Sequence, residues 1–317
     1  MFFTTNPPNP ESVNQDAIEA LNQFIAGDQN AVAVVTLSDL DRATAQAAGS
    51  LWSRIPVDTR RFVVHNMLEQ AEANIEFNFS RLLTIALNDP DSEVRAVAIQ
   101  GLWEDESTTF LERLLGLLQR EPEQLVREAI AEALGAFSLR AAEERLDQHW
   151  GDEIRSALLD LYRSRESIGV RRKALMSLAY FCDDAEVEAV IRDAFDSPYH
   201  DLQTSAVFAM GLNLDEQWFD VVLRSMADED PEMRFEAVRA VGRFGDERAI
   251  SSVLDLLDDE DREVQVAAIE ALGEIGGKTA MSTLRRLVKS DDIVLSEAAD
   301  EALHEATMVS GSVRLDS

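Results

Sequence analysis

Histidines and cysteines are the residues best suited to metal binding or nucleophilic chemistry, so their spacing is the first test for an enzymatic site. The chain has one cysteine, Cys182, and four histidines, His65, His149, His200 and His304. No two histidines stand four residues apart, as a metal site on one helix requires. Cys182 follows Phe181 and has no local cluster of Lys or Arg that would activate a thiol. The sequence therefore predicts no metal site and no catalytic residues.

Two other segments resemble ligand-binding loops without meeting their requirements. Residues 273–279 end in Gly277, Lys278 and Thr279, as a phosphate loop does, but position 272 is Leu where such a loop has its first glycine. Residues 255–261 are rich in Asp but lack the Asp-x-Asp-x-Asp-Gly order of a calcium loop. We expect a helix boundary in the first segment, a solvated acidic turn in the second, and no cofactor.

A short sequence pattern recurs along the chain and indicates the secondary structure on which the histidines, the cysteine and the two loop-like segments lie. An apolar anchor residue, often followed by Arg, precedes small residues at offsets of four and seven and a larger apolar residue at offset eight. The clearest copies begin at Val94, Met233 and Val264. The eight anchors are Arg60, Val94, Val126, Val170, Leu202, Met233, Val264 and Leu295, with spacings of 34, 32, 44, 32, 31, 31 and 31 residues. The regular spacing predicts an internal repeat.

Each copy is expected to form the second helix of a helical hairpin. Offsets of zero, four, seven and eight lie on one stripe of a 3.6-residue helix, and another apolar-periodic stretch precedes most anchors. Turn residues such as Asp230-Pro231 separate the two stretches, while Gly135, Gly211, Gly242, Gly245, Gly273 and Gly276 are expected to end second helices. A hairpin of about thirty residues cannot bury its own apolar stripe, so the copies must stack. The sequence thus predicts an all-α, right-handed α-solenoid of about eight hairpins.

Composition limits the class of partner. Asp and Glu number 60 against 29 Lys and Arg, for a formal net charge of -31, which disfavours nucleic acid and anionic membranes. A single cysteine cannot form an internal disulfide and suits a reducing, cytoplasmic compartment. The first positively charged residue is Arg42, and no apolar run is long enough for a membrane span, so we expect neither a signal peptide nor a span.

The repeats resemble the HEAT family, in particular a short-repeat bacterial subclass related to bilin lyases. The resemblance rests on residues 89–95, 228–234 and 259–264, each followed by an Ala-x-x-Ala-Leu-Gly type of helix, and it covers roughly residues 57–306. It implies a ladder between turn Asp residues and second-helix Arg residues. The ladder would use Arg95, Arg127, Arg171 and Arg234, and it would be interrupted at Gln203, Gln265 and Ser296.

Two regions depart from the period. Residues 1–10 are expected to form a mobile arm, and residues 11–56 a helical cap over the open end of the repeats at 57–306. The 44-residue spacing between Val126 and Val170 predicts an extra helical segment near 139–150. Residues 307–317 lose the periodicity and are expected to form a flexible tail.

A partner-binding groove is predicted where aligned repeat positions collect aromatic, Met and Arg side chains. Offsets two and six after each anchor are expected to point into the concave side, and only the central copies carry such residues there. With two more residues one turn further on, the predicted groove comprises Arg172, Met176, Tyr180, Phe208, Phe235, Arg239 and Arg243. The alternative is that the apolar members face the next repeat and belong to the core.

These observations favour a noncatalytic scaffold that binds a peptide or protein segment, and the arginines make an acidic segment one candidate. The alternative is an enzyme or enzyme subunit of the bilin lyase-like type, which the resemblance implies. Against this alternative, one Cys and three Lys offer little nucleophilic chemistry. A di-iron centre of the kind held by HEAT-repeat deoxyhypusine hydroxylases needs several His-Glu dipeptides, and only His304-Glu305 has that form.

Overall fold

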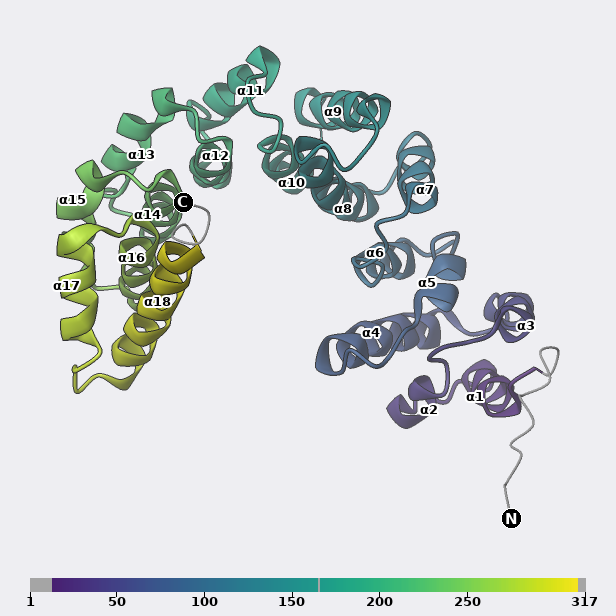
Figure 1. The fold of residues 1–317 in the computed structure, drawn as a ribbon. Helices are drawn as coiled ribbons and strands as arrows, with labels where there is room; N and C mark the ends of the chain where they lie inside the picture. The colour runs from purple at the N-terminus through teal and green to yellow at the C-terminus, as the bar shows by residue number, and fades with distance from the viewer. Residues whose placement is uncertain (1–12, 165, 313–317) are drawn as a thin grey trace. The chain divides into compact units, whose positions relative to one another are not determined.

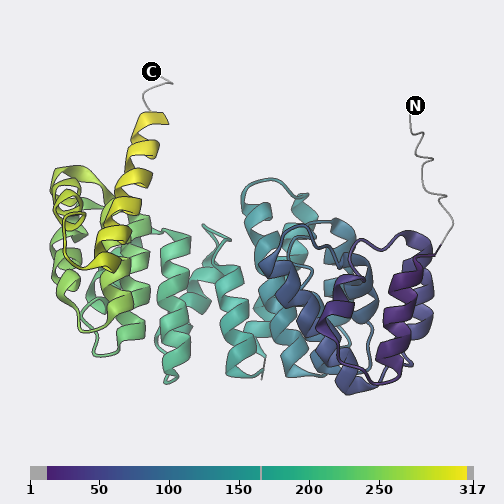
Figure 2. The ribbon, with the colours of Figure 1, turned by 90° about the horizontal axis from the view of Figure 1, so that it is seen from below.

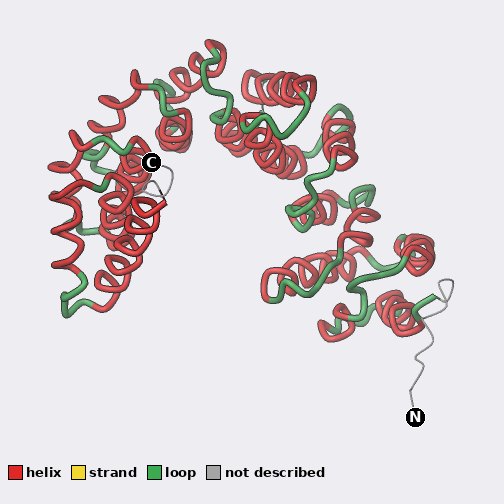
Figure 3. The backbone as a smooth tube through the Cα atoms, in the orientation of Figure 1, coloured by secondary structure: helices red, strands yellow, loops and turns green. Residues whose placement is uncertain are grey.

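The computed structural model describes residues 13–164 and 166–312, and these residues contain helices and no strand (Figures 1 and 3). The α-helices are α1 (Gln15–Ile25), α2 (Ala31–Val35), α3 (Arg42–Trp52), α4 (Val57–Ala73), α5 (Ser80–Ala86), α6 (Ser92–Gln100), α7 (Thr108–Leu118), α8 (Gln124–Ala142), α9 (Gln148–Arg163), α10 (Ile168–Leu178), α11 (Ala185–Phe195), α12 (His200–Asn213), α13 (Phe219–Ser225), α14 (Pro231–Phe244), α15 (Ile250–Asp255), α16 (Arg262–Ile275), α17 (Gly277–Leu287) and α18 (Ile293–Ser312). Short 3-10 helices stand at Glu216–Trp218, Glu247–Ala249 and Leu256–Asp258.

The predicted α-solenoid is confirmed. Each of the eight anchors lies on a different even-numbered helix from α4 to α18. The preceding odd-numbered helix packs against it as a hairpin partner in α5–α6 and in each pair from α9–α10 to α17–α18. The anchors from Val94 onward, except Leu295, are buried. Helices α1 to α3 precede the first anchor. The predicted arm at residues 1–10 lies outside the described residues.

The chain divides into two compact units, Met1–Phe137 and Ser138–Ser317. In the C-terminal unit the second helices α10, α12, α14, α16 and α18 lie side by side in one row. The first helices of the same hairpins form the other row (Figure 1), and Figure 2 shows the members of a row standing next to one another. One face of each second helix is therefore left uncovered by its own hairpin partner.

Close helix approach, not helix termination, explains three of the predicted helix-end glycines. A Cβ atom added at Gly211 would lie 2.5 Å from Cβ of Ala240, and one at Gly273 would lie 3.0 Å from Cβ of Ala302. Gly242 stands against Ala271 in the same register. These three glycines, like Gly135, lie inside helices. Only Gly245 and Gly276 of the predicted set have the positive φ of a closing residue, at 63° and 69°.

The acidic turns have specific structural roles, which corrects the expectation that they are simply solvated. Carboxylate oxygens of Asp230 and Asp261 each accept a hydrogen bond of 2.8 Å from the backbone N–H two residues later, and so cap α14 and α16. The side chain of Asp259 is only 6% exposed and forms an ion pair with Arg234. Capping hydrogen bonds and an ion pair between repeats therefore engage these turn carboxylates.

The long spacing between Val126 and Val170 is accommodated differently from the expectation. Residues 139–142 continue α8, and α9 begins at Gln148, so the additional residues lengthen two helices and form no separate one. The predicted flexible tail also begins too early, because α18 continues to Ser312; residues 313–317 lie outside the described part of the chain. None of the described helices is both long enough and apolar enough to cross a membrane.

Candidate functional site

The seven residues of the predicted groove lie on or just after three successive second helices of the C-terminal unit. Every one of them is partly exposed, so none belongs to the fully buried core. We call them the central face: Arg172, Met176 and Tyr180 from α10 and its end, Phe208 from α12, and Phe235, Arg239 and Arg243 from α14. Partial exposure leaves part of each side chain accessible to another molecule.

Two arginines of the central face stack on its aromatic rings. The Cζ atom of Arg243 lies 5.2 Å from the ring centroid of Phe208 on the neighbouring helix, and that of Arg239 lies 5.4 Å from the ring of Phe235. Such cation–π contacts contribute about 0.5–2 kcal/mol each. Nη1 of Arg243 lies 3.4 Å from the position that a Cβ of Gly211 would occupy, so the glycine makes room for the guanidinium group.

Three carboxylates that lie outside the predicted groove adjoin the arginines. Burial raises the pKa of Glu236, Glu270 and Glu274, although the nearby positive charge of Arg239 opposes the rise. Burial, together with Arg239, lowers the pKa of Arg243. Among the described residues no ion pair joins these carboxylates to Arg239 or Arg243. Oε2 of Glu236 and Nη1 of Arg243 are both buried without a hydrogen-bond partner.

The repeat register contains a signal for these carboxylates. Glu274 stands ten residues after its anchor, as Arg243 does, and Glu270 stands six after its anchor, as Arg239 does. Offsets six and ten therefore identify Glu270 and Glu274, whereas Glu236, three residues after its anchor, lies at neither offset. Their separation from the arginines depends on lateral helix packing, which the sequence pattern does not specify.

Arg172 differs from the other two arginines because it is already engaged. Its Nε donates a 3.0 Å hydrogen bond to Oγ of Ser205, and its terminal nitrogens lie 3.5 Å from Asp201 and 3.8 Å from Glu232. It therefore ties α10 to α12 and to the start of α14. Arg239 and Arg243 are the central-face arginines best placed to bind an added group.

One group of metal-ligating residue types occurs within the described part of the chain: His200, Asp230 and Glu232. Their ligand atoms lie within 4.8 Å of one another, and Nε2 of His200 is 3.0 Å from Oδ2 of Asp230. The residues stand at the N-terminal ends of α12 and α14, where the helix dipole disfavours a cation, and Arg172 adds a positive charge nearby. This environment favours the His–Asp contact over metal coordination.

The arginines of the expected ladder contact the turns in two ways. Arg95 binds both oxygens of Glu121, at 2.7 and 2.9 Å, and Arg234 binds both oxygens of Asp259, at 2.7 and 2.8 Å. Arg127 donates to the backbone oxygens of Leu118 and Glu121 at 3.2 Å. Nε of Arg171 donates a 3.1 Å hydrogen bond to the backbone oxygen of Tyr162, and Nη2 of Arg171 lies 3.7 Å from Oδ2 of Asp193. Arg95 and Arg234 thus each form a two-pronged ion pair with a carboxylate of the next repeat.

Gln203 and Gln265, where the ladder arginine is missing, retain one of its functions. Each side-chain amide donates to the carbonyl oxygen six residues earlier, at 2.9 and 2.7 Å. Arg95 and Arg234 make the same backbone contact with Nη1. Ser296 donates instead to the oxygen of Val288 at 2.7 Å. Arg61 and Asp91 form a further ion pair that the predicted ladder does not include, with Nη2 of Arg61 2.6 Å from Oδ2 of Asp91.

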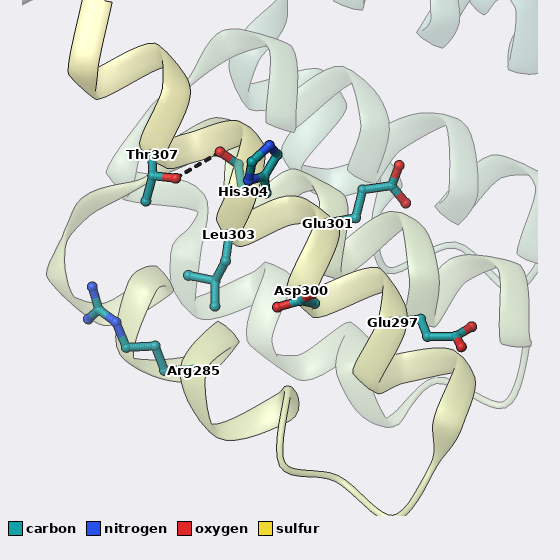
Figure 4. Close-up of a pocket in the computed structure, with 7 residues that line it drawn as sticks. All are labelled: Arg285, Glu297, Asp300, Glu301, Leu303, His304 and Thr307. Atoms are coloured by element: carbon teal, nitrogen blue, oxygen red, sulfur yellow. Dashed lines mark hydrogen bonds between the residues drawn. The ribbon is translucent and has the colours of Figure 1, made fainter.

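A shallow recess of about 660 Å³ lies between α17 and α18 (Figure 4). It is lined by Arg285, Glu297, Asp300, Glu301, Leu303, His304 and Thr307. The labelled side chains diverge: Arg285 lies on one side, while Glu297 and Glu301 extend toward the other. The hydrogen bond drawn there runs from Oγ1 of Thr307 to the backbone oxygen of His304, at 2.8 Å.

Comparison with known proteins identifies the family. A sequence profile of the HEAT repeats matches residues 79–157, 191–264 and 220–304, more than half of the chain. The chain belongs to the HEAT-repeat family. No match to this HEAT-repeat chain was found among curated proteins.

Several solved structures are similar to the HEAT-repeat chain. The complex of CpcE and CpcF of phycocyanin lyase from Nostoc sp. PCC7120 is 16% identical, with a TM-score of 0.52, covering 84% of this chain and 97% of that one. An engineered protein is 22% identical, with a TM-score of 0.41, over 63% of this chain and 97% of its own. Kap95p, in a structure with RanGDP, is 13% identical, with a TM-score of 0.48, over 92% of this chain and 43% of its own.

Proposed function

We propose that the protein is a noncatalytic scaffold and that its central face binds a peptide or protein segment. HEAT repeats generally mediate interactions between proteins, and family membership supports that class of function. The observation that carries the proposal is the grouping of partly exposed aromatic, Met and Arg side chains on or just after three consecutive second helices. Aromatic residues, Met and Arg are enriched at the cores of protein interfaces.

The two arginines give the surface its polar specificity. Arg239 and Arg243 have no ion-pair partner among the described residues and are held in place by Phe235 and Phe208. A carboxylate brought by the bound segment can accept hydrogen bonds from both guanidinium groups, whose planar shape suits bidentate binding. The surrounding apolar atoms exclude water and strengthen that contact.

Affinity capture with matched variants tests the proposal. The triple variant Phe208→Ala, Phe235→Ala and Arg239→Ala is expected to lose partner capture, because removal of an interface anchor typically costs about 2 kcal/mol or more. A control variant, Tyr199→Ala with Arg224→Ala, removes an exposed aromatic ring and an exposed arginine from the same unit but outside the central face. It is expected to capture the partner normally.

Thermal melting accompanies the capture assay, because unfolding would also abolish binding. Nearly unchanged melting of the triple variant assigns its loss to the central face, whereas a steep fall would place these side chains in the inter-repeat core. The bilin lyase-like alternative is tested separately by the visible absorbance of the purified chain after incubation with a bilin. Transfer of the bilin to an acceptor protein would contradict a noncatalytic role.

A further inference from the structure

Two rows of side chains run across the second helices of the C-terminal unit, and both rows change from apolar to basic to acidic at the same helices. They occupy offsets six and ten after each anchor, from α10 through α18. The first row is Met176, Phe208, Arg239, Glu270 and Glu301, and the second is Tyr180, Leu212, Arg243, Glu274 and Glu305. Both rows are therefore apolar at α10 and α12, basic at α14, and acidic at α16 and α18.

Contacts between neighbouring helices show that these rows form one surface. Arg243 of α14 leans back over Gly211 and Phe208 of α12, and Glu274 of α16 leans back over Gly242 of α14 in the same way. The charge of Glu274 interacts with that of Arg243, and the charge of Glu270 interacts with those of Glu301 and Glu305. The order of side-chain types along the rows is thus an order in space.

The acidic end of the surface is incompletely compensated. Glu270, Glu274, Glu301 and Glu305 are exposed, and no ion pair to any of them occurs among the described residues. Although both side chains reach solvent, partial desolvation by neighbouring atoms raises the pKa of Glu270 and Glu274, and the negative charge of Glu305 raises both further. Arg239 and Arg243 compensate this charge only from the α14 side. A cation placed over α16 and α18 would be stabilised.

We propose that the segment bound by this surface is extended and has three parts in a defined order. Apolar side chains contact α10 and α12, a carboxylate contacts Arg239 and Arg243 on α14, and Lys or Arg side chains contact the glutamates of α16 and α18. This proposal rests on the proposed scaffold function and specifies its partner. Neighbouring helices pack about 8–10 Å apart, so five of them span about 30–40 Å. An extended chain covers that distance with about ten to twelve residues.

Charge complementarity excludes simpler partners. A wholly acidic segment would meet the four glutamates at one end, and a wholly basic segment would meet the two arginines in the middle. Each like-charge contact in a partly desolvated site opposes binding. The ordered segment avoids both kinds of repulsion.

The probe for this proposal is a synthetic peptide of about twelve residues, bearing Leu and Phe in its first third, two Asp in the middle and three Lys at the end. Fluorescence anisotropy compares it with a scrambled peptide of the same composition. The ordered peptide is expected to bind at least about tenfold more tightly than the scrambled one. Equal affinities would overturn the proposed order.

A variant with reversed charge at the acidic end of the surface tests whether the basic third of the peptide binds there. Glu270→Lys with Glu301→Lys is expected to weaken binding at least about tenfold. The control, Asp220→Lys with Asp255→Lys, makes the same change in net charge at exposed positions on first helices α13 and α15. It is expected to change affinity less than about twofold. Equal effects of the two variants would show a response to net charge alone and would overturn the proposal.

The outcomes also separate this inference from the function on which it rests. If the Phe208, Phe235 and Arg239 variant loses capture of the cellular partner but the ordered peptide binds no better than its scrambled form, the scaffold function stands and the specified segment is wrong. If that variant captures its partner normally, the central face is not the binding surface and both proposals fail. Circular dichroism of each variant confirms that the helices are retained.

Discussion

The guanidinium carbon of Arg243 on α14 lies 5.2 Å from the ring centroid of Phe208 on α12. The two residues are 35 positions apart in the chain, and the contact depends on the close approach of their helices at Gly211 and Ala240. A glycine buried in one helix thus positions a charged side chain of the next. This relationship makes the central face sensitive to the packing beneath it.

Gly211→Ala is expected to destabilise the protein by about 1–3 kcal/mol, because the added methyl group overlaps Ala240 and forces the helices apart. Chemical denaturation measures the free energy of unfolding. The matched control is Gly116→Ala in α7, where an added Cβ has no neighbour within 4 Å. There, the higher helix propensity of Ala should leave stability unchanged or raise it by up to about 1 kcal/mol. Equal losses at both sites would contradict the close-approach role of Gly211.

Arg95→Met is expected to cost about 3–5 kcal/mol, because it leaves the carboxylate of Glu121 buried and without its ion-pair partner. The side chains of Arg95 and Glu121 are only 11% and 2% exposed. Arg61 holds the same position in the preceding repeat, but its side chain is 41% exposed in the ion pair with Asp91, so Arg61→Met should destabilise the protein much less.

The double variant Arg95→Met with Glu121→Met tests the cause of this loss. Removing both charges abolishes the unpaired buried carboxylate, so the double variant should be more stable than Arg95→Met alone. Urea denaturation of the single and double variants gives the comparison. A double variant that is less stable than the single one would show that the Glu121 carboxylate has other stabilising partners.

Glu236→Gln is expected to raise stability near neutral pH. Burial raises the pKa of Glu236 above its ordinary value of 4.5, so the native state binds the proton more tightly than the unfolded state does. Wild-type stability therefore falls as pH rises through the elevated pKa, and the neutral amide avoids that loss. The advantage of the variant should disappear below pH 4.5, where both states are protonated. Melting temperatures of the two proteins, measured across this range, test the sign.

Ala237→Pro is expected to break α14, at a cost of about 3 kcal/mol or more, because proline removes a backbone hydrogen bond and clashes with the preceding turn. Ala237 is fully buried in the middle of that helix. Hydrogen exchange should show the largest loss of protection in α14, α16 and α18, since each repeat contacts chiefly its neighbours. An equal loss in all hairpins would indicate that the chain unfolds as a single cooperative unit.

The sequence by itself determined the hairpin and its repetition. Anchors such as Val94, Met233 and Val264 recur with small residues at offsets that only a 3.6-residue helix places on one stripe. A unit that cannot bury this stripe alone must stack on its neighbours, so the α-solenoid followed from local periodicity. The central-face positions followed from the same register, and the structure places all seven at partly exposed sites.

Only the tertiary structure determined which atoms of neighbouring helices and turns each residue contacts. Gly242 and Gly245 stand three residues apart and look alike in sequence, yet the first accommodates Ala271 of the next helix and the second closes its own helix with positive φ. Similarly, Asp259 belongs to an acidic turn but is buried against Arg234 from another repeat. Lateral spacing between helices is set by side-chain packing across the whole interface. A periodic pattern specifies which face of a helix is covered, but not which atoms of the neighbouring helix lie opposite each residue.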